Sequence, residues 1–152
     1  MMHDGKKNLA IVVGDEDAVV NGENRIPAYQ EFIKENNLGE PHIYTGIRDY
    51  SDGYNLYPQL VKDGIDGVIV TRDISSVGIM NSAMDAGKKI PEDLEIVTAS
   101  ATQLASVVRP ALTTIKQPLY DMGAVAMRML TKLMNNEEVD ETHIELPYEL
   151  AL

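Results

Sequence analysis

Leu9-Ala-Ile-Val-Val-Gly14 is a short aliphatic run that ends at a glycine. A strand with one solvated face alternates apolar and polar residues, so an unbroken aliphatic run is typical of a strand buried on both faces. Gly67-Val-Ile-Val70 has the same character. These runs therefore predict a parallel sheet that is covered by helices on both faces.

The segments between the aliphatic runs show helical periodicity, so strands and helices alternate along the chain. The expected strands are 9–14, 42–45, 67–70, 94–98, 111–115 and 144–152. The expected helices are one capped by Asn24, one capped by Ser51 or Asp52, one with the stripe Val77, Met80 and Met84, and one at 118–135. This alternation is typical of the α/β class, in which ligands bind at the carboxyl ends of the strands. The loops there are 14–25, 46–52, 71–76 and 98–110.

Composition and charge limit the classes of function. The 152 residues suffice for one ordinary domain and carry a formal net charge of −11. A nucleic-acid-binding surface needs clustered Lys and Arg, but the longest basic runs are Lys6-Lys7 and Lys88-Lys89. We therefore expect no direct contact with nucleic acid. The chain has no Cys, which excludes disulfides, thiol catalysis and thiolate metal sites.

Other features of the sequence argue against a membrane, a metal and a cofactor. No run approaches the roughly 20 apolar residues of a membrane span, and the first residues lack the pattern of a signal peptide. His3, His42 and His143 are isolated and lack the spacing of metal ligands. We expect a cytoplasmic protein with no membrane partner, no metal and no cofactor.

Three collinear blocks carry a family resemblance. They are Lys88-Lys-Ile-Pro-Glu-Asp-Leu-Glu-Ile-Val97, Val107-Val-Arg-Pro-Ala-Leu-Thr-Thr-Ile-Lys-Gln-Pro118 and Tyr120-Asp-Met-Gly-Ala-Val-Ala-Met-Arg-Met-Leu-Thr-Lys-Leu-Met-Asn135. In order and spacing they resemble the lactose-repressor/galactose-repressor family of bacterial transcription factors, from Lys6 to about Leu150. The second and third blocks look most similar to the catabolite control subfamily.

The resemblance implies a domain organisation. Family members carry a DNA-binding headpiece followed by two similar α/β subdomains, like those of a type I periplasmic binding protein. We expect residues 1–152 to form a partial effector-binding and dimerisation domain that corresponds to the C-terminal subdomain. On this reading the headpiece lies outside the chain, and DNA would be bound only through it. Residues 118–135 would belong with an N-terminal subdomain that is also missing.

The helix expected at 118–135 would then lack its partner. Its apolar stripe consists of Leu119, Met122, Ala126, Met129 and Leu133. A soluble monomer rarely exposes a stripe of this size. We therefore expect the helix to be displaced, domain-swapped or covered by a second copy.

The resemblance assigns four effector-site positions: Arg25, Arg72, Asp73 and Ser100. Arg25 falls where the family has an Arg that hydrogen-bonds effector hydroxyls. Asp73 lies at the start of a helix, which favours a helix cap over a ligand contact. Arg72 stands where the family often has Asn, and Ser100 where an Asp binds a sugar diol. A sugar phosphate or other anionic effector fits this charge better than a neutral sugar, and a site without any ligand stays open.

The resemblance also implies protein partners. Its two-fold subunit interface falls on Val77, Met80, Met84, Val107 and Val108, with ordinary core packing as the alternative for each. Arg109 matches an Arg that catabolite control proteins use near their phosphocarrier corepressor. We therefore expect a homodimer, and a phosphocarrier protein is a candidate partner.

The predicted function is the effector-binding and dimerisation region of a bacterial regulator of sugar and carbon catabolism genes, without enzymatic activity. One alternative is a lobe of a sugar-binding transport protein. Another is a phosphoacceptor receiver domain. Its expected residues occur in order: Asp15, Glu16, Asp17, Asp73, Thr98, Lys116 and Pro118. The long gap between the acidic cluster and Asp73 counts against the receiver domain.

Overall fold

The computed structural model describes residues 5–14 and 20–151. A six-stranded sheet has the order β2-β1-β3-β4-β5-β6. Its strands are β1 (Leu9–Val12), β2 (His42–Tyr44), β3 (Gly67–Val70), β4 (Glu95–Thr98), β5 (Thr113–Lys116) and β6 (Glu149–Ala151). The α-helices are α1 (Ile26–Glu35), α2 (Tyr50–Lys62), α3 (Asp73–Asp85), α4 (Gln103–Val107) and α5 (Leu119–Met134), and a π-helical segment, η2 (Val20–Arg25), precedes α1.

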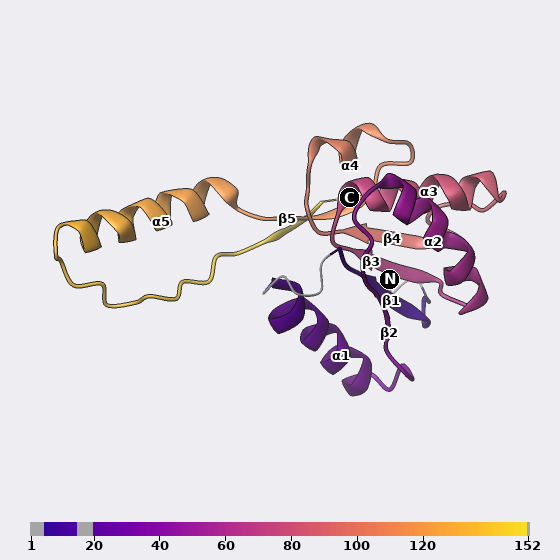
Figure 1. The fold of residues 1–152 in the computed structure, drawn as a ribbon, viewed down its shortest axis with the longest axis horizontal. Coiled ribbons are helices and arrows are strands. Elements are labelled where there is room, and N and C mark those ends of the chain that lie inside the picture. Colours follow the sequence, from indigo (N-terminus) through magenta and orange to yellow (C-terminus); the bar gives the residue numbers. More distant parts are fainter. Residues whose placement is uncertain (1–4, 15–19, 152) are drawn as a thin grey trace.

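Strands β1 to β5 are parallel, and β6 pairs antiparallel with β5 at one edge. The predicted parallel sheet is therefore confirmed. In β1, Val12 belongs to the core shared with α2 and α3, whereas Ile11 packs with Tyr29 and Ile33 of α1. Figure 1 shows α1 on one side of the sheet and α2 and α3 on the other. The aliphatic run at 9–14 is thus buried on both faces.

Helices α2 and α3 approach each other closely because two glycines lie where they cross. A Cβ on Gly53 would come within 2.2 Å of the Ser75 carbonyl oxygen, and one on Gly78 within 2.2 Å of the Tyr50 carbonyl oxygen. Both neighbours are backbone atoms, which cannot move aside as a flexible side chain can. Close packing here holds α3, which begins at Asp73, against α2.

Two helix starts differ from the sequence-based expectation. Asp49, not Ser51 or Asp52, caps α2: its carboxylate accepts a hydrogen bond from the Asp52 N–H at 2.9 Å, and the Asp52 carboxylate accepts from the Asp49 N–H. This reciprocal pair is a capping box. Asn24 does not cap α1, because η2 runs directly into it and Arg25 occupies the position before its first residue.

Two further segments correct the prediction. The loop expected at 98–110 contains the short helix α4, whose five residues are too few to show a helical period. The strand expected at 144–152 is confined to Glu149–Ala151. The residues between α5 and β6 form no helix or strand within the described chain.

Helix α5 forms an arm that extends away from the sheet. Figure 1 shows it joined to the body only through β5 and through the extended segment that returns to β6. No residue of α5 is buried, and Leu119 is 67% exposed. Of the predicted apolar stripe, Leu119, Met122, Ala126 and Leu133 are exposed, whereas Met129 is half-buried.

Candidate functional site

The loops at the carboxyl ends of β1, β3 and β4 bring together most of the predicted effector-site residues. Arg72 follows β3 and is exposed, and its guanidinium lies against Gly14 at the end of β1. A Cβ on Gly14 would come within 2.8 Å of Arg72 Nε. The glycine therefore leaves the space that the arginine side chain occupies. Asp15, Glu16 and Asp17, which the receiver alternative needs, lie outside the described residues.

Arg25 lies at the other side of this region, immediately before α1. It is half-buried and lines a hollow of about 300 Å³ together with Thr71, Ala99 and apolar side chains of α1 and the sheet. Burial lowers the pKa of the Arg25 guanidinium, because the charged form loses hydration. A cation is thus held beside an apolar surface at the strand ends.

Asp73 is buried and makes several hydrogen bonds within the protein. Its carboxylate is 3% exposed and accepts hydrogen bonds from the Thr98 hydroxyl, from the Thr102 hydroxyl at 2.6 Å and from the Thr102 N–H at 2.6 Å. Asp73 is the first residue of α3, and Arg72 occupies the N-cap position, so the prediction that Asp73 caps this helix is wrong. The carboxylate instead accepts hydrogen bonds from Thr102, at the end of loop 99–102. Asp73 therefore joins β4 to the start of α4.

Ser100 is also engaged within the protein. Its hydroxyl donates to the Thr71 carbonyl oxygen at 2.7 Å. The next residue, Ala101, has φ of 49°, a left-handed conformation that costs an L-residue about 1–2 kcal/mol. Its N–H donates to Thr114 Oγ1 at 3.1 Å, and Gln117 Nε2 donates to the Ala99 carbonyl oxygen at 3.2 Å. These bonds fix loop 99–102 to β5 and to the start of the α5 arm.

Thr102, Thr114 and Gln117 were not among the predicted site residues. Thr114 and Gln117 belong to the second resemblance block, which marked the family without assigning these side chains a role. Their partners lie 13 and 18 positions away in the chain. No periodicity in the sequence reports contacts of this kind.

The predicted interface residues fall into two groups. Val77 and Met80 are 8% and 2% exposed and belong to the chain's own core. Met84 and Val107 are 43% and 56% exposed, and Val108 is half-buried. Ile74, at the start of α3, is a further exposed apolar residue that was not predicted. Of the predicted interface residues, Met84, Val107 and Val108 therefore leave apolar surface accessible to another molecule, and Ile74 adds to it.

Arg109 is exposed between α4 and β5. Its Nη1 donates to the carbonyl oxygens of Ser106 and Val108 at 3.0 and 2.7 Å. The side chain is therefore folded over its own loop at the protein surface.

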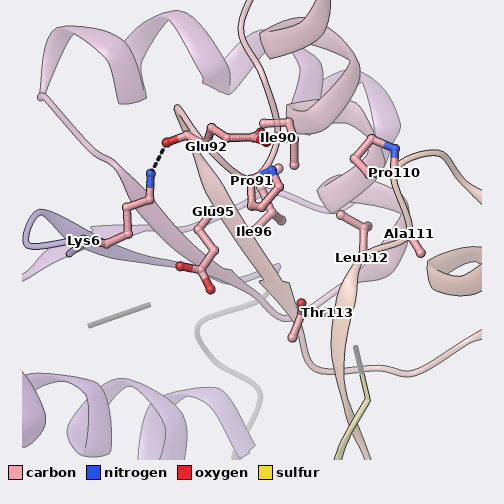
Figure 2. A pocket seen from close by; sticks show the side chains of 10 residues that line it. All are labelled: Lys6, Ile90, Pro91, Glu92, Glu95, Ile96, Pro110, Ala111, Leu112 and Thr113. Carbon is pink, nitrogen blue, oxygen red and sulfur yellow. Dashed lines mark hydrogen bonds between the residues drawn. The ribbon is translucent and has the colours of Figure 1, made fainter. Parts of the chain in front are cut away.

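A second hollow lies at the amino-terminal ends of the strands, where β4 and β5 begin. Figure 2 shows Pro91 and Ile96 on one side of it and Pro110 and Leu112 on the other. Its volume is about 370 Å³, and Lys6 Nζ donates to the Glu92 carbonyl oxygen at its rim at 2.6 Å.

Within the described residues, no group of three or more His, Cys, Asp or Glu side chains is arranged to hold a metal. None of the described helices is both long and apolar enough to cross a membrane.

Comparisons with known proteins match the whole chain. The periplasmic binding protein-like domain family covers residues 1–152. The chain is 65% identical to the HTH-type transcriptional regulator pepR1 of Lactobacillus delbrueckii subsp. lactis, over 99% of this chain and 45% of that protein. It is 40% identical to catabolite control protein A of Streptococcus mutans, over 91% of this chain and 42% of that protein.

A solved structure extends the match to the fold. The transcription regulator CcpA of Lactococcus lactis is similar with a TM-score of 0.89 and 37% identity, over 99% of this chain and 56% of that one. The chain thus spans less than half the length of the curated relatives it matches. The family match favours a periplasmic binding protein-like domain over the alternative of a phosphoacceptor receiver domain. The chain belongs to the periplasmic binding protein-like domain family, in the form found in regulators of the lactose-repressor/galactose-repressor type.

Proposed function

We propose that this chain is the effector-binding and dimerisation region of a transcriptional regulator of sugar and carbon catabolism genes. The observation that carries the proposal is the 65% identity, over 99% of the chain, to a protein described as a transcriptional regulator. The arrangement of polar side chains at the strand ends supports a binding role, because ligands of parallel α/β sheets bind there. DNA would be bound by a headpiece outside these residues.

The effector class that fits the site is an anionic small molecule such as a sugar phosphate. Arg25 and Arg72 both lie at the strand ends, and guanidinium groups suit phosphate geometry. The Asp73 carboxylate and the Ser100 hydroxyl, which could bind sugar hydroxyls, make their hydrogen bonds within the protein. A neutral sugar would therefore find few acceptors among the described residues.

A thermal-shift series tests this proposal. Glucose 6-phosphate should raise the melting temperature by about 5 °C or more at saturation, whereas glucose should not. Arg25→Gln and Arg72→Asn should each abolish the rise, and Arg128→Gln on the α5 arm is the matched control. An equal response to glucose and glucose 6-phosphate would contradict the anionic class. No response to either would leave the region without a small effector.

We propose further that the chain pairs with a second copy through α3 and the segment after α4. Ile74, Met84 and Val107 are exposed apolar residues on these two elements. Met84→Glu combined with Val107→Glu should convert a dimer into a monomer in light scattering, because it places charges in an apolar contact. Asn55→Glu, an exposed position on α2, is the control.

The regulator family suggests two further contacts, one within the longer protein and one with another protein. In the longer protein, α5 would pack on an N-terminal subdomain, which would cover the apolar stripe that is exposed here. Arg109 would contact a serine-phosphorylated phosphocarrier corepressor. Titration of that protein against the longer regulator should show weaker binding for Arg109→Ala, with Lys88→Ala as the control.

A further inference from the structure

Three consecutive residues at the start of α3 serve three different parts of the molecule. Arg72 is exposed at the strand ends, where the effector site is proposed. Asp73 is 3% exposed and makes its hydrogen bonds within the protein. Ile74 is 41% exposed and belongs to the surface proposed for pairing with a second copy. The buried carboxylate is therefore a direct neighbour of that pairing surface in the chain.

The partner that Asp73 holds is Thr102, the residue before α4. The Thr102 hydroxyl donates to Asp73 Oδ2 at 2.6 Å and accepts a hydrogen bond from the Leu104 N–H at 3.3 Å. One oxygen atom therefore both caps α4 and attaches it to α3. The Thr102 N–H donates to the same carboxylate oxygen at 2.6 Å. The start of α4 is thus attached to the start of α3 by two hydrogen bonds.

The carboxylate itself cannot turn without losing partners. Its Oδ1 accepts from the Thr98 hydroxyl at the end of β4, whereas its Oδ2 accepts from Thr102. Hydrogen bonds to a charged acceptor are stronger than those between neutral groups, and burial protects them from competition by water. Asp73 therefore fixes Thr102 relative to both the sheet and α3.

Helix α4 needs this attachment because it is short. Its five residues, Gln103–Val107, form about one and a half turns, and an isolated helix of this length is unstable in water. Ala105 is its buried residue, and the Ala105 carbonyl oxygen accepts from the Leu112 N–H at 2.9 Å. The Asp73–Thr102 contact holds the beginning of α4, and the contact of Ala105 holds its middle.

The position of α4 decides the shape of the pairing surface. Ile74 and Met84, toward the two ends of α3, are 41% and 43% exposed. Val77 lies between them on α3 but is 8% exposed, and it shares a core cluster with Ala105 of α4. Val107, at the end of α4, is 56% exposed. The surface is therefore built from two helices, and its shape depends on how α4 lies against α3.

We propose that Asp73 and Thr102 are positioning residues for the contact with a second copy, because their hydrogen bonds hold α4 and Val107 in the place that matches the partner. The inference rests on the pairing surface proposed above and adds the internal contact that shapes it. Interfaces pack as closely as protein interiors at their centre. A helix that is already ordered also loses less conformational entropy on binding, so a fixed α4 favours pairing.

Matched substitutions separate positioning from a general loss of stability. Thr102→Val removes the hydroxyl with little change of shape, and Thr102→Ser restores it. Tyr44→Phe is the control, because it also removes a hydroxyl that donates to a carboxylate at 2.6 Å, but in β2, outside α3 and α4. In sedimentation equilibrium of the 152-residue chain, Thr102→Val should raise the dimer dissociation constant at least about tenfold. Thr102→Ser and Tyr44→Phe should keep the parent value.

Asp73→Asn is a second variant that leaves the cap of α4 in place. It replaces one acceptor oxygen of the carboxylate by a donor nitrogen and removes the charge, so it weakens the attachment from the α3 side. It should raise the dissociation constant in the same direction as Thr102→Val. A normal dissociation constant in Asp73→Asn would assign the effect to the cap alone and would overturn the role of Asp73.

A distance measured within one chain reports the position of α4 directly. The chain has no cysteine, so Ala86→Cys, directly after α3, and Ser106→Cys, on α4, can carry a pair of spin labels. Dilution with unlabelled chain restricts the measurement to one molecule. The distance distribution should broaden or shift when Thr102→Val is added, and it should keep its form when Tyr44→Phe is added.

The outcomes distinguish the inference from the proposal on which it rests. A monomeric parent chain, or a dimer that survives Met84→Glu with Val107→Glu, would refute the pairing surface and the positioning role together. If those glutamates abolish the dimer but Thr102→Val leaves the dissociation constant unchanged, the pairing surface stands and the positioning role is overturned. An unchanged distance distribution in Thr102→Val, or an equal weakening of the dimer by Tyr44→Phe, also overturns it.

Discussion

The carboxylate of Asp73 accepts two hydrogen bonds from Thr102, one from its N–H and one from its hydroxyl, both at 2.6 Å. The two residues are 29 positions apart in the chain. Asp73 begins α3, and Thr102 precedes α4, so this contact joins two helices across the end of β4. It also holds the loop that contains Ser100.

Replacing Asp73 should therefore be costly. Asp73→Ala leaves the buried hydroxyl of Thr98 and the N–H of Thr102 without their acceptor, and we expect a loss of about 3 kcal/mol in the free energy of unfolding. Urea unfolding measures the loss. Asp140→Ala, at an exposed position in the return segment, should change it by less than about 0.5 kcal/mol. A loss of similar size in both variants would contradict the role assigned to Asp73.

The crossing of α2 and α3 predicts a steric effect. Gly78→Ala places a methyl group within 2.2 Å of a backbone oxygen and should destabilise the protein by about 3 kcal/mol. Gly123→Ala is the control, because nothing lies within 4 Å of its Cβ position on α5. Alanine there should stabilise the helix by about 0.5–1 kcal/mol. Thermal unfolding of the two variants should shift in opposite directions, and equal shifts would refute the close approach.

The start of α2 offers a test of the corrected cap. Asp49→Ala removes the acceptor for the Asp52 N–H and should cost about 1 kcal/mol. Ser51→Ala, at a position that the sequence suggested as a cap, should change stability by less than about 0.5 kcal/mol. Denaturant unfolding of both variants decides between the two positions. A larger loss for Ser51→Ala would favour the original prediction.

Acid stability should depend on a pair at the end of α2. The Tyr44 hydroxyl donates to Asp63 Oδ2 at 2.6 Å and, with Gln59, lowers the pKa of the Asp63 carboxyl. A carboxyl whose pKa is lower in the folded state stabilises the protein above its unfolded pKa of about 3.9, and this contribution is lost as pH falls through the folded pKa.

The stability advantage of the parent chain over Tyr44→Phe should accordingly be constant above about pH 5 and shrink as pH falls below about 4. Melting temperatures recorded from pH 7 down to the acid limit of folding measure it. Tyr148→Phe, which alters an exposed tyrosine, should give no pH-dependent difference. An advantage of Tyr44 that grows in acid would have the wrong sign and would exclude the pair as its source.

The sequence by itself determined the class of fold. Strand β1 could be recognised from Leu9 to Gly14 because a strand in the middle of a parallel sheet is apolar on both faces, and that property is local. The stripe of α5 was likewise visible in the order of its residues. The family followed from three sequence blocks, because their order and spacing can be read without any structure.

Only the tertiary structure decided what the polar side chains do. Asp73 looked like a helix cap from its position, but Thr98 and Thr102, which are 25 and 29 positions away, take its hydrogen bonds. The burial of Met80 and the exposure of Met84, on one helix stripe, depend on which side of α3 meets the sheet. Local pattern reports periodicity, whereas the partner of a buried polar group or an apolar face is set by segments far away in the chain.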